Sequence, residues 1–183
     1  MKKLYIFLAD GFEEIEGLTV VDIARRAGIE VVMVSITGNK MVQGAHEICI
    51  STDILFENQD FTDADMLVLP GGMPGTNALM EHEGLRNLLI DFDKQKKNLA
   101  AICAAPSVFG VNGLLMGKKA VCYPGFEEKL HGAVVSYDNV AIDGHVITSR
   151  GMGTAIEFAL AIVTKLVDEA TSDRLAKAIV YRS

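Results

Sequence analysis

The chain has 183 residues, 50% hydrophobic and 22% charged, which is enough to bury the core of one α/β domain, and we predict a single domain over residues 1–183. Its 17 basic and 24 acidic residues give a formal net charge of −7 without any basic run, which argues against nucleic acid and anionic membranes as partners. The N-terminal apolar run is interrupted at Asp10 and is shorter than the hydrophobic region of a signal peptide, so we expect a cytoplasmic protein.

Strands and helices are predicted to alternate along the first half of the chain. Short apolar or β-branched runs predict buried strands at residues 4–9, 29–36 and 66–69. Residues 41–51 carry polar interruptions and predict a less buried strand pair. Apolar residues at helical spacing predict helices over residues 15–26, through Leu79, and over about 85–97.

The second half continues this alternation. Strands are predicted at residues 99–102 and 117–122, and helices at about 106–112, 126–130, 154–167 and 172–180. Residues 134–135 and 140–142 predict the strands of a hairpin, which turns at Asp143-Gly144 into a strand over 145–148. The order of elements predicts an α/β fold with a doubly wound, mainly parallel sheet sandwiched by helices, with an added β-hairpin.

A cysteine stands where the central strand is expected to turn into a helix. Residues 99–102 end directly before Cys103, and Pro106 suits the first turn of the next helix, where its missing N–H costs nothing. The unpaired N–H groups and positive dipole end of that helix favour thiolate over thiol. The flanking alanines allow the close backbone approach that a nucleophile elbow requires. The alternative is a buried, inert free cysteine, since cysteine is among the most buried residue types.

Two further loops are expected at the same edge of the sheet. They follow the first and third buried strands of the parallel sheet, so they should bring Glu16 and the pair Gly71-Gly72 near Cys103. The N–H groups of Gly72 and Ala104 could then stabilise an oxyanion.

Glu16 lies between apolar residues, whereas Glu13 and Glu14 fit a solvated helix start. Burial would raise the pKa of Glu16, and a protonated carboxyl can donate a hydrogen bond to the Cys103 thiolate. An ionised carboxylate would instead disfavour a second negative charge. The chemistry therefore requires Glu16 to be neutral when the thiolate forms.

Six short motifs are spread along almost the whole chain. They are Ala-Asp-Gly-Phe-Glu-Glu-Ile-Glu (9–16), Arg-Arg-Ala-Gly (25–28), Val-Leu-Pro-Gly-Gly (68–72), Ala-Ala-Ile-Cys-Ala-Ala-Pro (100–106), Thr-Ser-Arg-Gly-Met-Gly-Thr (148–154) and Glu-Phe-Ala-Leu-Ala-Ile-Val (157–163). Their order resembles the DJ-1/ThiJ/PfpI superfamily, and the DJ-1 branch most. The resemblance implies a flavodoxin-like fold, a homodimer, a reactive Cys103 and a protonated Glu16. It also places the backbone donors on Gly72 and Ala104.

The same resemblance implies an activity. It is a cofactor-independent glyoxalase III-type reaction on small α-oxoaldehydes, or a related deglycase reaction, with Cys103 as nucleophile and Glu16 as proton carrier. The alternative that it implies is a redox-sensing or chaperone-like stress protein in which Cys103 is oxidised. Intracellular peptidase activity and a link to thiazole biosynthesis belong to other members and fit this sequence less well. The expected partners are a small carbonyl substrate and a second copy of the chain.

The sequence departs from the family pattern at three positions. Tyr123 stands where DJ-1-like members often have histidine, and Ala104 stands where the peptidase branch has histidine, so a Cys-His dyad is not expected. Tyr123 either orients the substrate or fills the space. His46 replaces an arginine that a partner subunit points toward the pocket, and it either takes that role or is a solvated strand histidine. Gly71 and Arg150 complete the expected pocket.

The remaining cysteines and histidines are expected to take no part in chemistry. Cys49 and Cys122 lie in strand-like segments, and the odd, widely spaced set that they form with Cys103 fits neither a disulfide framework nor a zinc site. Residues 151–153 are Gly-Met-Gly rather than GxGxxG, so no dinucleotide site is predicted. We therefore expect no cofactor and no metal. The histidines expected on the surface are His82, His131 and His145.

Overall fold

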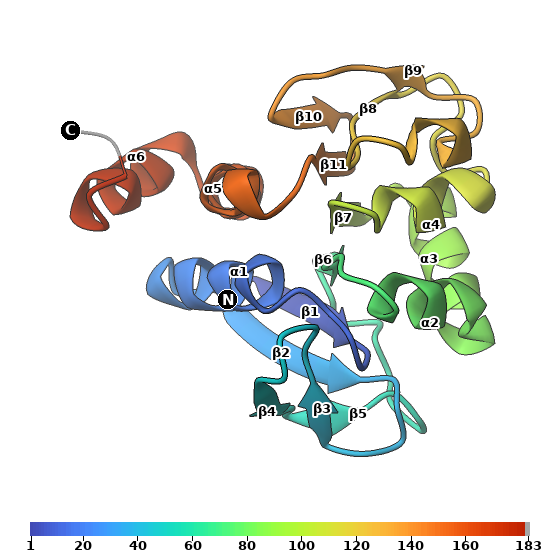
Figure 1. Ribbon diagram of the computed structural model, residues 1–183. Helices are drawn as coiled ribbons and strands as arrows, with labels where there is room; N and C mark the ends of the chain where they lie inside the picture. Colours follow the sequence, from blue (N-terminus) through green and yellow to red (C-terminus); the bar gives the residue numbers. More distant parts are fainter. Residues whose placement is uncertain (182–183) are drawn as a thin grey trace.

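Seven strands form the main sheet, in the order β10-β11-β7-β6-β1-β2-β5 (Figure 1). We describe residues 1–181 of a computed structural model; residues 182–183, the last two of the expected 1–183 domain, lie outside the described residues. Neighbouring strands are parallel except β10 and β11, which are antiparallel. The strands are β1 (Lys3–Leu8), β2 (Glu30–Ser35), β5 (Ile54–Leu55), β6 (Met66–Leu69), β7 (Asn98–Ile102), β10 (Val140–Asp143) and β11 (Val146–Ser149). The predicted α/β fold with a mainly parallel sheet is confirmed.

Helices cover both faces of this sheet (Figure 1). One face carries α1 (Glu14–Arg26), α5 (Ala155–Leu166) and α6 (Glu169–Ala178), and the other carries α2 (Gly75–Glu81), α3 (Glu83–Lys94) and α4 (Pro106–Val111). Successive residues of β1 alternate between the two cores, with Leu4 and Ile6 in the first and Tyr5 and Phe7 in the second. No helix within residues 1–181 is long and apolar enough to cross a membrane.

Three loops meet at the carboxyl edge of the central strands. β1, β6 and β7 are parallel neighbours, with Ile6 opposite Val68 and Val68 opposite Ala100. The segments that follow these strands therefore leave from the same edge, where α/β sheets place their ligands. A backbone hydrogen bond joins two of the segments, since the Glu13 N–H donates to the Gly71 carbonyl oxygen at 2.9 Å.

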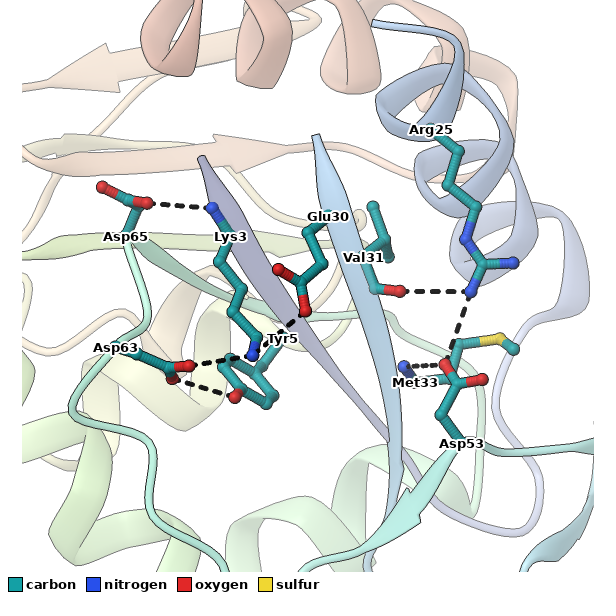
Figure 2. A network of polar contacts seen from close by, with 9 residues as sticks. All are labelled: Lys3, Tyr5, Arg25, Glu30, Val31, Met33, Asp53, Asp63 and Asp65. Atoms are coloured by element: carbon teal, nitrogen blue, oxygen red, sulfur yellow. Dashed lines mark hydrogen bonds and ion pairs between the residues drawn. The ribbon is translucent and has the colours of Figure 1, made fainter. Parts of the chain in front are cut away.

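A network of charged side chains lies at the opposite edge of the sheet, where β1 and β2 begin (Figure 2). The Lys3 ammonium lies 2.8 Å from an oxygen of Asp63 and 3.1 Å from one of Glu30. The Tyr5 hydroxyl donates to Asp63 at 2.9 Å, and the Lys3 backbone N–H donates to Asp65, also at 2.9 Å. The hydrogen bond to Asp63 contributes most to raising the pKa of Lys3, so the ammonium group stays charged. These contacts tie the segment before β6 to the start of β1 and so fix where β6 enters the sheet.

The predicted hairpin is wrong in one of its strands. Val134–Val135 forms β9 and pairs in parallel with β8 (Lys119–Ala120) in a separate two-stranded sheet, not with residues 140–142. Residues 140–143 pair instead with β11, because the tight Asp143-Gly144 turn brings these two strands together locally. The added hairpin is thus β10–β11, at the edge of the main sheet.

Smaller elements differ in detail from the prediction. The less buried strand pair is confirmed as β3 (Met41–Gln43) and β4 (Cys49–Ser51), whereas β5 was not predicted. The helical pieces η1 (Glu127–Lys129) and η2 (Met152–Thr154) are single 3₁₀ turns. Helix α6 begins three residues before the predicted Ser172, because the Asp168 carboxylate accepts a hydrogen bond from the Thr171 N–H at 2.6 Å and caps the helix.

Candidate active site

Cys103 lies in a sharp turn between β7 and α4. Its φ is +66°, a left-handed conformation that a non-glycine residue adopts only when its surroundings enforce it. Its N–H donates to the Ser149 carbonyl oxygen at 3.0 Å, and its carbonyl oxygen accepts from the Tyr123 N–H at 2.7 Å. Pro106 occupies the first turn of α4, as predicted. The turn is therefore held on both sides, and the thiol stands at the carboxyl edge of the sheet.

Glu16 faces the thiol from the first turn of α1 and is only 1% exposed. Its carboxyl group and the Cys103 side chain are hydrogen-bonded to one another, and its Oε2 accepts from the Gly71 N–H at 2.9 Å. Burial raises the pKa of Glu16 to about 7, although the bonds to Cys103 and Gly71 favour the charged form. The carboxyl group can therefore both donate and accept a proton near neutral pH.

The contact between these two side chains depends on Gly71. A Cβ at this position would lie 2.6 Å from the Cβ of Cys103 and 2.7 Å from Oε2 of Glu16, both too close for an unstrained contact. The glycine is required here for space, since it lets the β6 loop pass between the nucleophile and the carboxyl group.

Burial and three neighbouring groups set the protonation of Cys103. Burial, followed by the charge and hydrogen bond of Glu16, raises the pKa of the Cys103 thiol to about 12, while the backbone N–H groups of Ala104 and Gly72 lower it. Gly72 and Ala104, whose N–H groups are the predicted oxyanion donors, thus both favour a negative charge on the sulfur. The expectation that the helix start favours the thiolate is outweighed by burial and by an ionised Glu16. A thiolate forms readily only when the proton of the pair resides on the Glu16 carboxyl.

A cavity of about 640 Å³ opens above the sulfur, within the usual size of a small-molecule site. The predicted pocket residues Tyr123 and Arg150 line it; the Tyr123 side chain is half exposed and faces Gly151. The Arg150 guanidinium stacks on the Tyr137 ring at 5.7 Å. Among the described residues, no histidine lines this cavity. The sequence reasoning missed its other lining residues, which are Glu13, Met73, Pro124, Phe126, Asn139, Gly151, Met152, Gly153 and Thr154.

His46 lies apart from this cavity and contacts the start of α1. Its Nδ1 is 3.0 Å from Oε2 of Glu14, and its backbone N–H donates to Oε1 of Glu14 at 2.8 Å. The side chain of Glu14 is 5% exposed and that of Glu13 16%. The interpretation of these glutamates as a solvated helix start is therefore wrong, because the loop after β3 covers them.

Two expectations about the other residues need correction. His145 is buried rather than on the surface, with Nε2 2.6 Å from Oδ1 of Asp93. Cys122 is buried, as expected for a packing residue, but Cys49 is exposed. All three cysteines are free.

Comparisons with known proteins agree on one family. A family model described as the DJ-1/PfpI family matches residues 2–165. Protein DJ-1 homolog B of Arabidopsis thaliana is 37% identical over 99% of this chain, which spans only 42% of that protein. The protein named glutathione-independent glyoxalase DJR-1.2 of Caenorhabditis elegans is 32% identical over 90% of this chain and 88% of its own length. The solved structure of oxidized Toxoplasma gondii DJ-1 matches all of both chains, with a TM-score of 0.96 at 33% identity.

The shared proton predicts an unusual pH profile for alkylation of Cys103. The pair loses its first proton near pH 7, so the rate constant for iodoacetamide should inflect near pH 7, reach a plateau, and rise again toward pH 12. In Glu16→Gln the inflection near pH 7 should disappear, because no carboxyl group titrates at this position, and the remaining inflection should fall below pH 12, because the charge and hydrogen bond of Glu16 no longer raise the pKa of the Cys103 thiol. Mass spectrometry of the peptide that contains Cys103 gives the rate for this residue alone. A wild-type profile with one inflection near the ~8.5 of an exposed thiol would contradict this account.

Proposed function

The chain belongs to the DJ-1/PfpI family, and from this premise we propose that it is a cofactor-independent glyoxalase-type enzyme, or a related deglycase, acting on small α-oxoaldehydes. The observation that carries the proposal is the hydrogen bond between the buried Glu16 carboxyl and Cys103 at the base of an open cavity. The name of the Caenorhabditis elegans relative supports the same reaction class.

The first step forms a bond between sulfur and the aldehyde carbon. The Cys103 thiolate adds to the aldehyde of methylglyoxal, and the resulting oxyanion accepts hydrogen bonds from the N–H groups of Gly72 and Ala104, which already face the sulfur. The protonated Glu16 then donates its proton to this oxygen. The product is a neutral hemithioacetal and an ionised Glu16.

The second step moves a proton from one carbon to the next. The Glu16 carboxylate removes the proton from the former aldehyde carbon and gives it to the ketone oxygen, so an enediol forms and Glu16 is ionised again. Glu16 then takes the proton of the hydroxyl group on the former aldehyde carbon and delivers a proton to the neighbouring carbon. This gives a thioester, so the aldehyde carbon is oxidised while the ketone carbon is reduced. Water cleaves the thioester, releases lactate and restores the thiol. The sum is methylglyoxal plus water to lactate, which requires no external oxidant or reductant.

The cavity supports Glu16 rather than histidine as the proton carrier. A Cys-His dyad of the peptidase type needs an imidazole beside the sulfur, and no histidine among the described residues lines the cavity. Glu16, with a pKa near 7, can act as both acid and base in the same cycle. Tyr123 and Arg150 lie on the walls, where they would orient the substrate.

We also propose that two copies of the chain associate through the exposed side of α1. A groove lined by α1, the start of α5, the end of α6 and the loop before β4 carries three exposed isoleucines, Ile15, Ile48 and Ile156. These side chains are 49%, 54% and 37% exposed, next to Val180 at 85%. A cluster of exposed apolar side chains of this kind is typical of an interface between proteins.

A redox role is the second candidate function, and the partly accessible Cys103 thiol beside the Glu16 carboxyl group supports it. In this reading, peroxide oxidises the Cys103 thiolate to the sulfenate and then the sulfinate, and the protonated Glu16 donates a hydrogen bond to the product. The two functions need the same thiolate and are compatible.

The glyoxalase proposal predicts that purified protein converts methylglyoxal to lactate. Cys103→Ser should lower kcat/KM by about three orders of magnitude or more, and Glu16→Gln should lower kcat by roughly 10²–10⁴-fold, because proton transfer is lost. In D₂O the lactate should carry deuterium at C2, because the proton that Glu16 delivers to this carbon comes from a carboxyl group that exchanges with the solvent. Cys49→Ser is the matched control and should retain full activity. Equal turnover by wild type and Cys103→Ser would overturn the proposal.

The redox proposal predicts which cysteine mild peroxide oxidises first. Exposure favours Cys49, and burial raises the pKa of the Cys103 thiol, so oxidation of Cys103 first requires the thiolate that forms when the shared proton resides on Glu16. Peptide mass spectrometry should find two added oxygens on Cys103 before Cys49 or Cys122 reacts. Oxidation of Cys49 first would count against a sensor role.

The dimer proposal predicts a change of mass in solution. Sedimentation velocity should give a two-chain species for wild type and a one-chain species for Ile156→Glu, because the substitution places a charge in the apolar groove. Ile142→Glu is the control, because Ile142 is 52% exposed but lies on β10, away from this groove. A wild-type monomer, or an Ile156→Glu dimer, would contradict this choice of surface.

A further inference from the structure

We propose that Glu13, Glu14 and His46 form a binding site for a divalent transition-metal cation of the zinc class, separate from Cys103. The three side chains come from two distant segments, the start of α1 and the loop between β3 and β4. One ligand atom from each lies within 4.8 Å of the other two. The site does not depend on the proposed glyoxalase reaction.

The spacing of the ligand atoms suits a tetrahedral ion. Zinc bonds of about 2.0–2.1 Å to nitrogen and oxygen place neighbouring ligand atoms of a tetrahedron about 3.3 Å apart. The Nδ1 of His46 lies 3.0 Å from Oε2 of Glu14 and 3.6 Å from Oε2 of Glu13. These two distances lie on either side of the tetrahedral value, so an ion could enter with small side-chain shifts.

The kinds of ligand favour one class of metal. Imidazole nitrogen and carboxylate oxygen are both zinc ligands, and three protein ligands leave a fourth tetrahedral position open, whereas calcium and magnesium prefer oxygen ligands alone. In the single chain the His46 side chain is 67% exposed, which leaves space for that fourth ligand.

Charge provides an argument independent of spacing. Glu14 is 97% buried, and a buried carboxylate is ordinarily paired with a cation or bound to a metal. Within residues 1–181, no lysine or arginine forms an ion pair with Glu13 or Glu14; their side-chain partner is the exposed imidazole of His46. The site therefore gathers two carboxylates around a single imidazole.

The carboxylate that points toward the imidazole is held in place before any ion binds. Oε1 of Glu14 accepts the His46 N–H, which leaves Oε2 directed at Nδ1. Gly44 lies against this carboxylate, where a Cβ would overlap it. Such fixed partners of a metal ligand commonly change metal affinity by 10–100-fold.

Titration of untagged protein with Co²⁺ tests the proposal. We expect one equivalent of Co²⁺ per chain to give visible d–d bands of a tetrahedral nitrogen and oxygen site, and Zn²⁺ to abolish them. The bands should appear unchanged in Cys103→Ser and should lack a sulfur-to-cobalt charge-transfer band, so failure of this proposal and failure of the cysteine chemistry are distinguishable. Counting per chain makes the result independent of any association between chains.

Two substitutions identify the ligands. His46→Ala and Glu13→Gln should each weaken Co²⁺ binding by about tenfold or more. His131→Ala removes an exposed histidine elsewhere and should leave binding unchanged. Circular dichroism on each variant checks that it is folded. Absence of the bands at millimolar Co²⁺, a charge-transfer band from sulfur, or equal affinity in wild type and His46→Ala would overturn the site.

Discussion

One shared proton between Glu16 and Cys103 governs the rest of the candidate active site. Two negative charges cannot be held side by side in a buried site, so the pair keeps one proton over a wide pH range. Its position decides the chemistry, because a proton on Glu16 leaves a nucleophilic thiolate and a proton on Cys103 leaves an inert thiol. The N–H groups of Gly72 and Ala104 stabilise the first arrangement, and that of Gly71 the second. The backbone therefore distributes the charge between the two side chains.

The contact between Glu16 and Cys103 depends on two features of the fold, which are the parallel central strands and the absence of a side chain at Gly71. β1, β6 and β7 end at the same edge, so a helix start, a glycine loop and an elbow converge without any long insertion. Gly71 then allows the carboxyl and the sulfur to approach across the loop. The charged network at the other edge, around Lys3 and Asp63, ties β1 to the segment before β6 and so fixes the placement of these strands.

The sequence predicts those parts of the site that depend on local signals. An apolar run followed by Cys103 and Pro106 marks a strand, a turn and a helix start, and the neighbouring strands then place Glu16 and Gly71 by topology alone. The errors concern contacts made by distant segments. Burial of Glu14 depends on a loop that returns from β3, and burial of His145 depends on Asp93 of α3. The pairing of β9 with β8 is equally non-local, since the residues of β9 have no pattern that distinguishes β8 from β10 as a partner. Glutamate and histidine are equally compatible with an exposed position, so only the tertiary structure shows that Glu14 and His145 are buried.

Catalysis and oxidation place different demands on the same pair. Oxidation requires only the thiolate, since the oxidant brings its own leaving group and the protonated Glu16 needs only to donate a hydrogen bond. The carbonyl reaction requires Glu16 to give its proton to one oxygen and to take another from carbon, which depends on a pKa close to the working pH. A substitution that keeps a hydrogen-bond donor at position 16 but removes the acid should therefore separate the two reactions. A carboxyl group that only donates a hydrogen bond would need a pKa well above the working pH, whereas burial raises the pKa of Glu16 to about 7, where both protonation states are populated. This is the physical basis of the proton-transfer reaction that we propose for the site.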